Sequence, residues 1–278
     1  MLAENKAEEV SALEVNGKGH KHNDKQALAN SAKGKVPAVT RAIAILRYLG
    51  RSPEPLGVNK IARELGLIPS TALHILRALM AEEMVSFDEQ TKQYELDVGV
   101  LTLAGSAVRR NSFIKSVQPG LDRLSDKFGL TMLAAKIMGL DHAIVVAISL
   151  SSLPVRLHTE LGSRFPALIS GTGRCLAAFG DFRKAELSKR FSRLNWAKPI
   201  SFNQWWEQVE QTKLSGYGVD EGNFLAGVTV IAVPVFEAGC MTHSIVAVGL
   251  HEQIADMGIA RIAKEIQQVA EELSSDAI

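Results

Sequence analysis

The sequence is poor in cysteine, in net charge and in long apolar runs, and each shortage excludes a class of protein. Two cysteines in 278 residues, Cys175 and Cys240, cannot supply a disulfide framework and fit a reducing compartment. The formal net charge is +1, so a nucleic-acid partner can be argued only from local charge. No apolar run approaches the roughly 18 residues of a membrane-spanning helix, and the N-terminus lacks the apolar stretch of a signal peptide. We therefore expect a cytoplasmic protein without a membrane partner.

The sequence also lacks the spacing of a metal site or a catalytic dyad. No base is identifiable for Cys175, and the segment GTGRC at 171–175 lacks the lysine and the length of a phosphate-binding loop. The histidines are scattered among predicted strands without metal-ligand spacing: His142, His158, His243 and His251. We expect no catalytic residue, no metal and no cofactor.

Composition predicts an ordered protein of about two domains. Hydrophobic residues make up 46% and charged residues 22%, as in ordinary globular proteins. Residues 1–36 carry too few large apolar groups to offset the entropy of the chain, so we expect a disordered tail there. We divide the remainder into a small domain at 37–98, a connecting helix at 99–114 and a larger α/β domain at 115–278.

Three short helices are predicted in the small domain. The first carries an apolar stripe that includes Ile43, and a break rich in proline and glycine follows it. The second covers residues 58–65 and stops at Gly66, which suits a left-handed conformation. Pro69 is pre-set for the first turn of the third helix, and we expect Ser70 to cap its amides.

A β-hairpin is predicted next, with strands at 85–87 and 93–96 around a polar turn. Two helices joined by a glycine-containing turn and followed by a hairpin are typical of a winged helix-turn-helix, whose second helix enters the major groove of DNA. The side chains that we expect to contact DNA are hydroxyls, an imidazole, one apolar group and several cations: Ser70, Thr71, Leu73, His74, Arg77, Arg41, Lys60 and Lys92.

Local charge assigns the attraction for phosphate to the helices and not to the hairpin. Residues 37–81 include six basic and two acidic side chains, a balance of +4, whereas residues 82–97 include one basic and six acidic side chains, a balance of −5. Lys92 is the one phosphate contact that we expect from the wing. A small packed subdomain without a nucleic-acid role remains the alternative.

The larger domain alternates helices and strands, which predicts a mixed α/β sheet domain. Trp196, Trp205 and Trp206 are expected as anchors of the core or of a dimer contact. Helices are predicted near 117–128, 171–180, 183–193, 203–215 and 256–273. Strands are predicted near 130–138, 142–150, 155–161, 217–220, 228–236 and 243–250.

Segments spread over residues 36–275 resemble the IclR family of transcriptional regulators. VPAVTRAIAILRYLG, IARELGLIPSTALHILRAL and YELDVGVLTLA resemble its N-terminal domain, and HTELGSRFPALISGTGRCLAA, GYGVDEGNFLAGVTVIAVPVF and IVAVGL resemble its effector domain. The resemblance implies an α+β protein with a winged helix-turn-helix, a connecting helix that supports dimerisation and a GAF/PAS-like effector domain. It also implies double-stranded operator DNA, a small organic effector and a homodimer or a dimer of dimers as partners. The recognition helix departs from the family, because Leu67-Ile68-Pro69-Ser70-Thr71 lacks the usual lysine.

The resemblance places an effector pocket where the GTGR segment begins a helix. Amides at a helix N-terminus favour an anion, Thr172 offers a hydroxyl, and Asp220 is expected to accept a ligand hydroxyl. Two alternatives stay open: the glycines serve close packing, and Asp220 caps a turn. The residues implied as effector-binding are Val155, Leu157, Gly171, Thr172, Gly173, Asp220, Val230, Ala247 and Gly249.

Three of these positions differ from common family residues, which changes the expected ligand. Val230 stands where many members carry cysteine, and Ala247 and Gly249 stand where some carry serine. We expect a roomier and less polar pocket, suited to an aromatic or cyclic acid or a lactone. The chain is thus expected to be a repressor or activator of a catabolic operon. A metabolic enzyme or a protein-interaction module with an accessory helix-turn-helix-like domain is the alternative.

Overall fold

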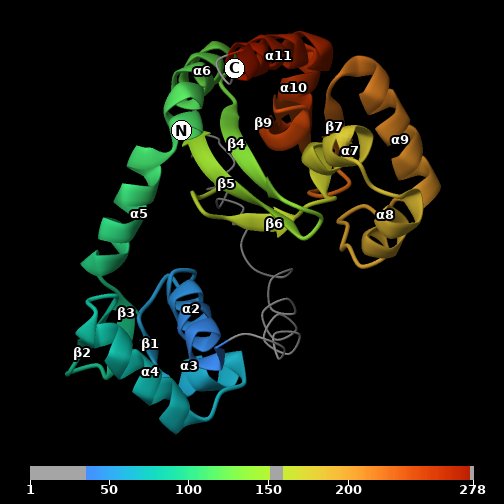
Figure 1. Cartoon of the computed structure of the whole chain (residues 1–278). Helices are drawn as coiled ribbons and strands as arrows, with labels where there is room; N and C mark the ends of the chain where they lie inside the picture. The colour runs from blue at the N-terminus through green and yellow to red at the C-terminus, as the bar shows by residue number, and fades with distance from the viewer. Residues whose placement is uncertain (1–35, 151–158, 276–278) are drawn as a thin grey trace, which may run out of the picture. The chain divides into compact units, whose positions relative to one another are not determined.

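The computed structural model describes residues 36–150 and 159–275 (Figure 1). Contacts divide the chain into two compact units between Asn111 and Ser112, and each is described by itself. The first unit is a helix-turn-helix with a three-stranded sheet, and the second carries a six-stranded antiparallel sheet, so the expected α+β class is confirmed. Within the described ranges, no helix is long and apolar enough to cross a membrane.

The first unit confirms the three predicted helices and the hairpin. Its elements are α2 (Pro37–Leu49), β1 (Leu56–Gly57), α3 (Val58–Leu65), α4 (Pro69–Ala81), β2 (Val85–Asp88), β3 (Gln93–Leu96) and α5 (Val98–Arg110). The strand β1 was not predicted, because two residues carry no alternation of apolar and polar side chains. It pairs antiparallel with β3, with Leu56 opposite Tyr94, and extends the hairpin into a sheet of order β1-β3-β2.

Apolar side chains of the three helices form the core of this unit. Ile45 of α2, Ile61 of α3 and Leu76 of α4 are fully buried, and burying each stabilises the unit by roughly 2 kcal/mol. The prediction for Ile43 is wrong, since its side chain is 40% exposed. Residues two apart on a helix point about 200° apart, so Ile43 and Ile45 cannot share one face.

The ends of these helices follow the prediction at one site and correct it at another. Gly66 ends α3 with φ +64, the left-handed conformation expected of it. Ser70 does not cap α4: the residue at the cap is Ile68, and no described side chain caps this helix. Pro69 occupies the first helical position, so Ser70 lies one residue inside the helix. Asp97 does cap α5, because its carboxylate accepts a hydrogen bond from the Val98 amide at 2.7 Å.

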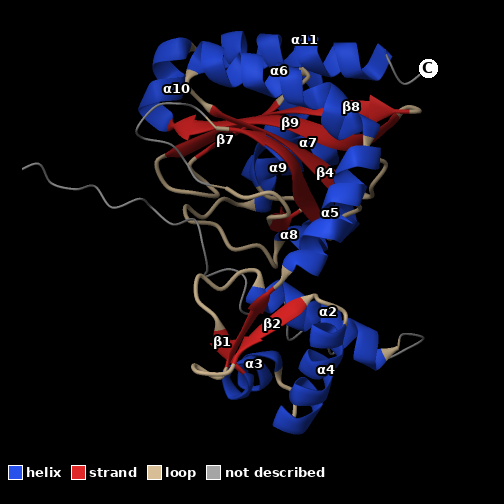
Figure 2. Cartoon of the chain, turned by 90° about the vertical axis from the view of Figure 1, so that its left-hand side faces the viewer, coloured by secondary structure: helices blue, strands red, loops and turns tan. Residues whose placement is uncertain are grey.

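The second unit confirms most predicted elements. They are α6 (Ser112–Phe128), β4 (Thr131–Met138), β5 (His142–Ser149), β6 (Arg164–Pro166), α7 (Ser170–Phe179), α8 (Lys184–Phe191), α9 (Phe202–Ser215), β7 (Gly218–Glu221), β8 (Val228–Glu237), β9 (Cys240–Leu250), α10 (His251–Met257) and α11 (Ile259–Ser275). The sheet order is β6-β5-β4-β9-β8-β7, and every pair is antiparallel. Helices α6, α10 and α11 lie over one face of the sheet, and α7 and α9 lie over the other (Figure 2).

Three predicted elements differ from the structure. Most of the strand expected at 155–161 lies outside the described residues, and 159–161 are not in a strand. The edge strand is β6 instead, whose Pro166 pairs with His142. The terminal helix expected from residue 256 begins at Ile259, because Gly258 adopts φ +83 and separates it from α10. The segment expected as one connecting helix, 99–114, is divided between α5 and α6.

The helix α7 packs against the sheet at close range. A Cβ atom on Gly171 would lie 2.9 Å from the Val230 carbonyl oxygen of β8, and one on Gly173 would collide with the Leu168 backbone in the turn before α7. The Cys175 thiol donates a hydrogen bond to the Ala232 carbonyl at 3.2 Å, and burial raises its pKa to about 12. The other cysteine, Cys240, is exposed at the start of β9.

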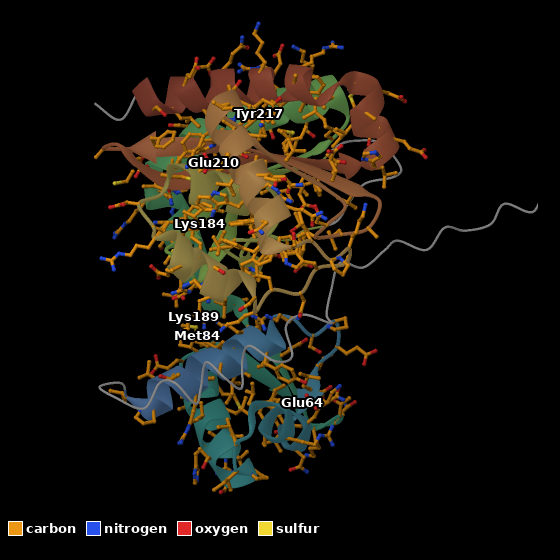
Figure 3. All side chains as sticks on the ribbon, turned by 90° about the vertical axis from the view of Figure 1, so that its right-hand side faces the viewer. Glu64, Met84, Lys184, Lys189, Glu210 and Tyr217 are labelled. Carbon is orange, nitrogen blue, oxygen red and sulfur yellow. The ribbon has the colours of Figure 1, made fainter. Side chains whose placement is uncertain are left out.

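Aromatic side chains anchor α8 and α9 beside α7. Trp205 is fully buried, and its ring centroid lies 5.2 Å from that of Phe191, which confirms its prediction as a core anchor. Lys184, labelled in Figure 3, places its Nζ 4.4 Å from the centroid of the Trp206 ring. The helices α8 and α9 are therefore packed into this unit.

We expect Gly173→Ala to lower the free energy of unfolding by about 3 kcal/mol, because the added Cβ collides with backbone that cannot move independently. Urea unfolding of the full chain measures this change. Gly105→Ala is the matched control: its Cβ would meet only the flexible end of Arg109, and alanine favours a helix. An unchanged midpoint for Gly173→Ala would contradict the close packing.

Candidate functional site

One side of α4 is free of core packing and carries polar groups. Ser70, His74 and Arg77 are exposed, and their spacing of three to four residues places them on one face of the helix. On the opposite face, Ala72 and Leu76 are buried in the core. This arrangement leaves the polar face available to the major groove of B-DNA, which is wide enough for an α-helix.

Two residues predicted for this face lie differently. Thr71 is half-buried at its margin. Leu73 is half-buried and packs against the core of the unit, so its prediction as a DNA contact is corrected. It lies three residues before Leu76 and therefore shares the inward side of α4.

Basic residues flank α4 within the same unit. Arg41 on α2 and Lys60 on α3 are exposed. The Nε of Arg63 on α3 lies 3.6 Å from Oε1 of the neighbouring Glu64, which is labelled in Figure 3; Arg63 is exposed and Glu64 is partly exposed. Such a pair adds little stability, so both side chains keep the freedom to rearrange.

The wing remains acidic in three dimensions. Lys92 is exposed in its turn, with φ +58, and its Nζ lies 5.8 Å from the centroid of the Phe87 ring. The Asp88 carboxylate accepts a hydrogen bond from the Gln90 amide at 2.7 Å, and this bond lowers the pKa of Asp88. Asp88 therefore keeps its negative charge at neutral pH, beside the one lysine of the hairpin.

The glycines at the start of α7 serve packing. Gly171 and Gly173 are buried, and the Gly173 amide already donates to the Ile169 carbonyl at 2.9 Å. A Cβ on Gly171 would lie 2.7 Å from the Gly218 carbonyl oxygen. Their expected role of admitting a ligand to the backbone is therefore corrected, and close packing accounts for both. The Thr172 hydroxyl is also engaged, 3.2 Å from the Ser244 hydroxyl.

A buried arginine, which sequence reasoning missed, holds this end of α7. Arg174 is fully buried, and its Nη1 donates to Asp220 Oδ2 and to the Ser170 carbonyl, each at 2.8 Å. Its Nε donates to Gln208 at 2.8 Å and its Nη2 to Asn223 at 3.2 Å. Burial lowers the pKa of Arg174, and the Asp220 carboxylate opposes that effect. A charged side chain within the apolar helix GTGRCLAAF was the available signal.

Asp220 is part of this cluster and is not open to a ligand. Its Oδ2 accepts from Arg174, and its Oδ1 accepts from the Phe224 amide at 3.0 Å. The expectation that it receives a ligand hydroxyl is therefore corrected. The Phe224 bond agrees with the alternative role of capping a turn.

The strands β8 and β9 divide the remaining predicted residues between two faces of the sheet. Val230 packs on the side of α7, together with Val246 and Val248. Ala247 packs on the other side, with α6 and α11. A Cβ on Gly249 would contact Leu130 and Ile254 on that same far side.

Ala247 and Gly249 therefore cannot line one site with Val230, and their prediction is corrected. Successive side chains of a strand point to opposite faces, so an assignment shifted by one residue selects the wrong face. Val155 and Leu157 lie outside the described residues.

The sequence matches two family models, which together span most of the chain. The model described as bacterial transcriptional regulator IclR C-terminal matches residues 105–275, and the IclR helix-turn-helix domain matches residues 38–89. The HTH-type transcriptional repressor AllR of Salmonella typhimurium (strain LT2) is 25% identical over 90% of this chain and 93% of its own length. The uncharacterized HTH-type transcriptional regulator RhmR of Escherichia coli K12 is 31% identical over 79% of this chain and 85% of its own length.

Solved structures share the fold. An IclR transcriptional regulator from Alicyclobacillus acidocaldarius aligns with a TM-score of 0.79 at 23% identity, covering 88% of this chain and all of that one. An IclR homolog from Microbacterium hydrocarbonoxydans, complexed with 4-hydroxybenzoate, aligns with a TM-score of 0.71 at 15% identity and covers 86% of this chain and 98% of that one. At these identities the likeness concerns the fold alone.

We expect Asp220→Ala to lower the free energy of unfolding by about 3–5 kcal/mol, because it leaves the buried Arg174 guanidinium without its counter-charge. The double variant Arg174→Met/Asp220→Ala should lose less than the two single variants summed. A double-mutant cycle by urea unfolding measures this coupling.

The exposed pair Arg190–Asp141, also 2.8 Å apart, is the matched control. Asp141→Ala should cost less than about 1 kcal/mol because water screens that pair. Equal costs at the two pairs would show that burial does not determine the strength of the Arg174 interaction.

Proposed function

Because the chain belongs to the IclR family of bacterial transcriptional regulators, we propose that it controls a catabolic operon in response to a small organic acid. The family binds DNA through the helix-turn-helix and an effector through the C-terminal domain, and it is not a family of enzymes. The exposed polar face of α4 carries this proposal most directly, because it leaves a helix of the right size free for the major groove.

In the proposed complex, Ser70, Thr71, His74 and Arg77 of α4 contact base edges and phosphates. Hydroxyls suit phosphate oxygens, while arginine and histidine can donate to guanine or phosphate. Cations outside α4 add phosphate contacts that fix the position of the unit on the duplex: Arg41, Lys60 and Lys92. The proposal leaves out Leu73, which packs inward.

The proposed assembly is a homodimer, or a dimer of dimers, that binds two half-sites of an operator. A DNA-binding dimer sets its half-site spacing through the connection between its domains. We propose that residues 37–98 form the winged helix-turn-helix, that residues 99–114, divided between α5 and α6, form the connection, and that residues 115–278 form the effector domain. Since its proposed partner is chromosomal DNA, we place the protein in the cytoplasm at the nucleoid.

The proposed effector is an aromatic or cyclic acid or a lactone. The proposal of an apolar effector is supported by the side chains on the face of the sheet that packs against α7. Val230, Val246 and Val248 lie on this face and present only methyl groups. The Microbacterium relative was solved with an aromatic acid, 4-hydroxybenzoate. An effector that binds one arrangement of the effector domain more tightly shifts the population toward it and changes operator affinity accordingly.

We expect the full-length protein to retard a fragment of its own upstream region, with affinity that falls steeply as salt is added. Arg77→Ala and His74→Ala should each weaken this binding, Arg77→Ala by about tenfold, while leaving effector-induced stabilisation unchanged. Arg193→Ala, which removes an exposed arginine from the second unit, is the control and should bind as the wild type does. Failure to bind any promoter fragment would refute the proposed function.

We expect aromatic carboxylic acids such as 4-hydroxybenzoate to raise the melting temperature of the wild type, by linkage of binding to folding. Val248→Ser should reduce that shift, because it adds a hydroxyl to the apolar face of the sheet that packs against α7. Val219→Ser is the control, since Val219 is half-buried on β7 and alternates with Gly218 and Asp220, which face α7. Stabilisation by two-carbon acids alone would contradict the proposed effector class.

A further inference from the structure

A branched apolar side chain stands in solvent at the leading end of α4. Ile68 is 69% exposed, whereas the next apolar residues of the helix, Ala72 and Leu76, are fully buried. Ile68 precedes the exposed face that carries Ser70 and His74. It is therefore part of the end of α4 that meets base edges first in a helix-turn-helix complex.

Folding gives no reason for isoleucine at this position. Ile68 occupies the N-cap of α4, where serine, threonine, aspartate or asparagine would accept a hydrogen bond from the first amides. Its side chain can neither accept that bond nor reach the core of the unit, because most of its surface faces water. Single exposed apolar side chains also occur elsewhere in the described residues, as at Leu214; Ile68 differs because it stands at the end of α4 that meets base edges first.

The backbone holds Ile68 in a fixed position. The Leu67 amide donates to the Ala62 carbonyl at 2.8 Å, and the Ile68 carbonyl accepts from the Ala72 amide at 3.0 Å. Pro69 fixes the next φ angle, and a β-branched side chain has few rotamers of its own. The methyl groups of Ile68 are thus placed in advance, so their burial against a partner loses little entropy.

We infer that Ile68 is a specificity-determining residue that packs against the C5-methyl group of a thymine in the major groove. This inference rests on the proposed function. Thymine is the one base that presents a methyl group in that groove, and apolar side chains recognise it by contact. Its polar neighbours on α4, Ser70 and His74, suit hydrogen-bonding edges instead, so Ile68 adds preference for T·A at one base pair.

The dependence of binding on salt concentration separates this contact from the other proposed contacts. Ile68 carries no charge, so its contact with thymine releases no counterions on binding. Removing the Ile68 side chain should therefore leave the salt dependence unchanged. Arg77→Ala, by contrast, should make that dependence shallower. The two variants therefore separate base recognition from phosphate attraction on the same helix.

The experiment measures binding of the full-length protein to its own operator fragment and to fragments in which each thymine in turn is replaced by deoxyuridine, which lacks the methyl group. The wild type should lose about fourfold in affinity at one thymine of each half-site, the value of one buried methyl group. Ile68→Ala should bind the unmodified fragment more weakly and show no further loss at that position. Its salt dependence should match that of the wild type.

Val39→Ala is the matched control, because Val39 is 59% exposed on α2 of the same unit, and it should keep the full deoxyuridine effect. Ile68→Val, which removes a single methyl group, should give an intermediate loss. The inference is overturned if Ile68→Ala retains the deoxyuridine effect of the wild type, or if no thymine replacement weakens the wild type. Either result leaves operator binding, and with it the proposed function, intact; failure of the wild type to bind any fragment would overturn both.

Discussion

The buried contact between Arg174 and Asp220 determines how α7, α9 and β7 of the second unit are assembled. A guanidinium withdrawn from water is costly unless its donors find partners, and Arg174 finds them on β7, on α9, in the turn after β7 and in its own helix. Because these partners come from separate segments, they must assemble in one arrangement to satisfy a single side chain. Gly171 of α7 allows the close approach to β7 and β8 that this arrangement requires.

Once α7 is fixed on the sheet, the alternation of strand residues decides which side chains face it. Val230 and Val246 face α7, and Ala247 faces away, although Val246 and Ala247 are neighbours in sequence. A functional role transferred to a strand residue from a related sequence therefore holds only if that residue lies on the corresponding face of the sheet. Polarity between α7 and the sheet comes from two separate groups: the Thr172 and Ser244 hydroxyls bond to each other, and Arg174 bonds to Asp220.

Local patterns predicted the elements well, and long-range contacts account for the failures. Gly66 and the hairpin strands were predicted because their signals lie within a few residues, as were the helices around Ile61 and Leu76. The strand Leu56–Gly57 and the contact of Asp220 with Arg174 depend on residues distant in sequence, so no local pattern encodes them. Roles assigned to Gly171 and Gly173 failed because glycine is equally suited to admit a ligand or a neighbouring segment of backbone, and only the fold distinguishes the two.

The contrast between the two cysteines makes the native chain a ready substrate for site-selective labelling. A thiol reacts as its thiolate, and the pKa of about 12 keeps Cys175 protonated in the core, hydrogen-bonded to a carbonyl. Cys240 is exposed at the start of β9, two residues after the left-handed Ala238. A maleimide dye would therefore attach at one place, on the β8–β9 hairpin of the second unit. Fluorescence could then follow this unit in an unmutated protein while DNA and effector are added.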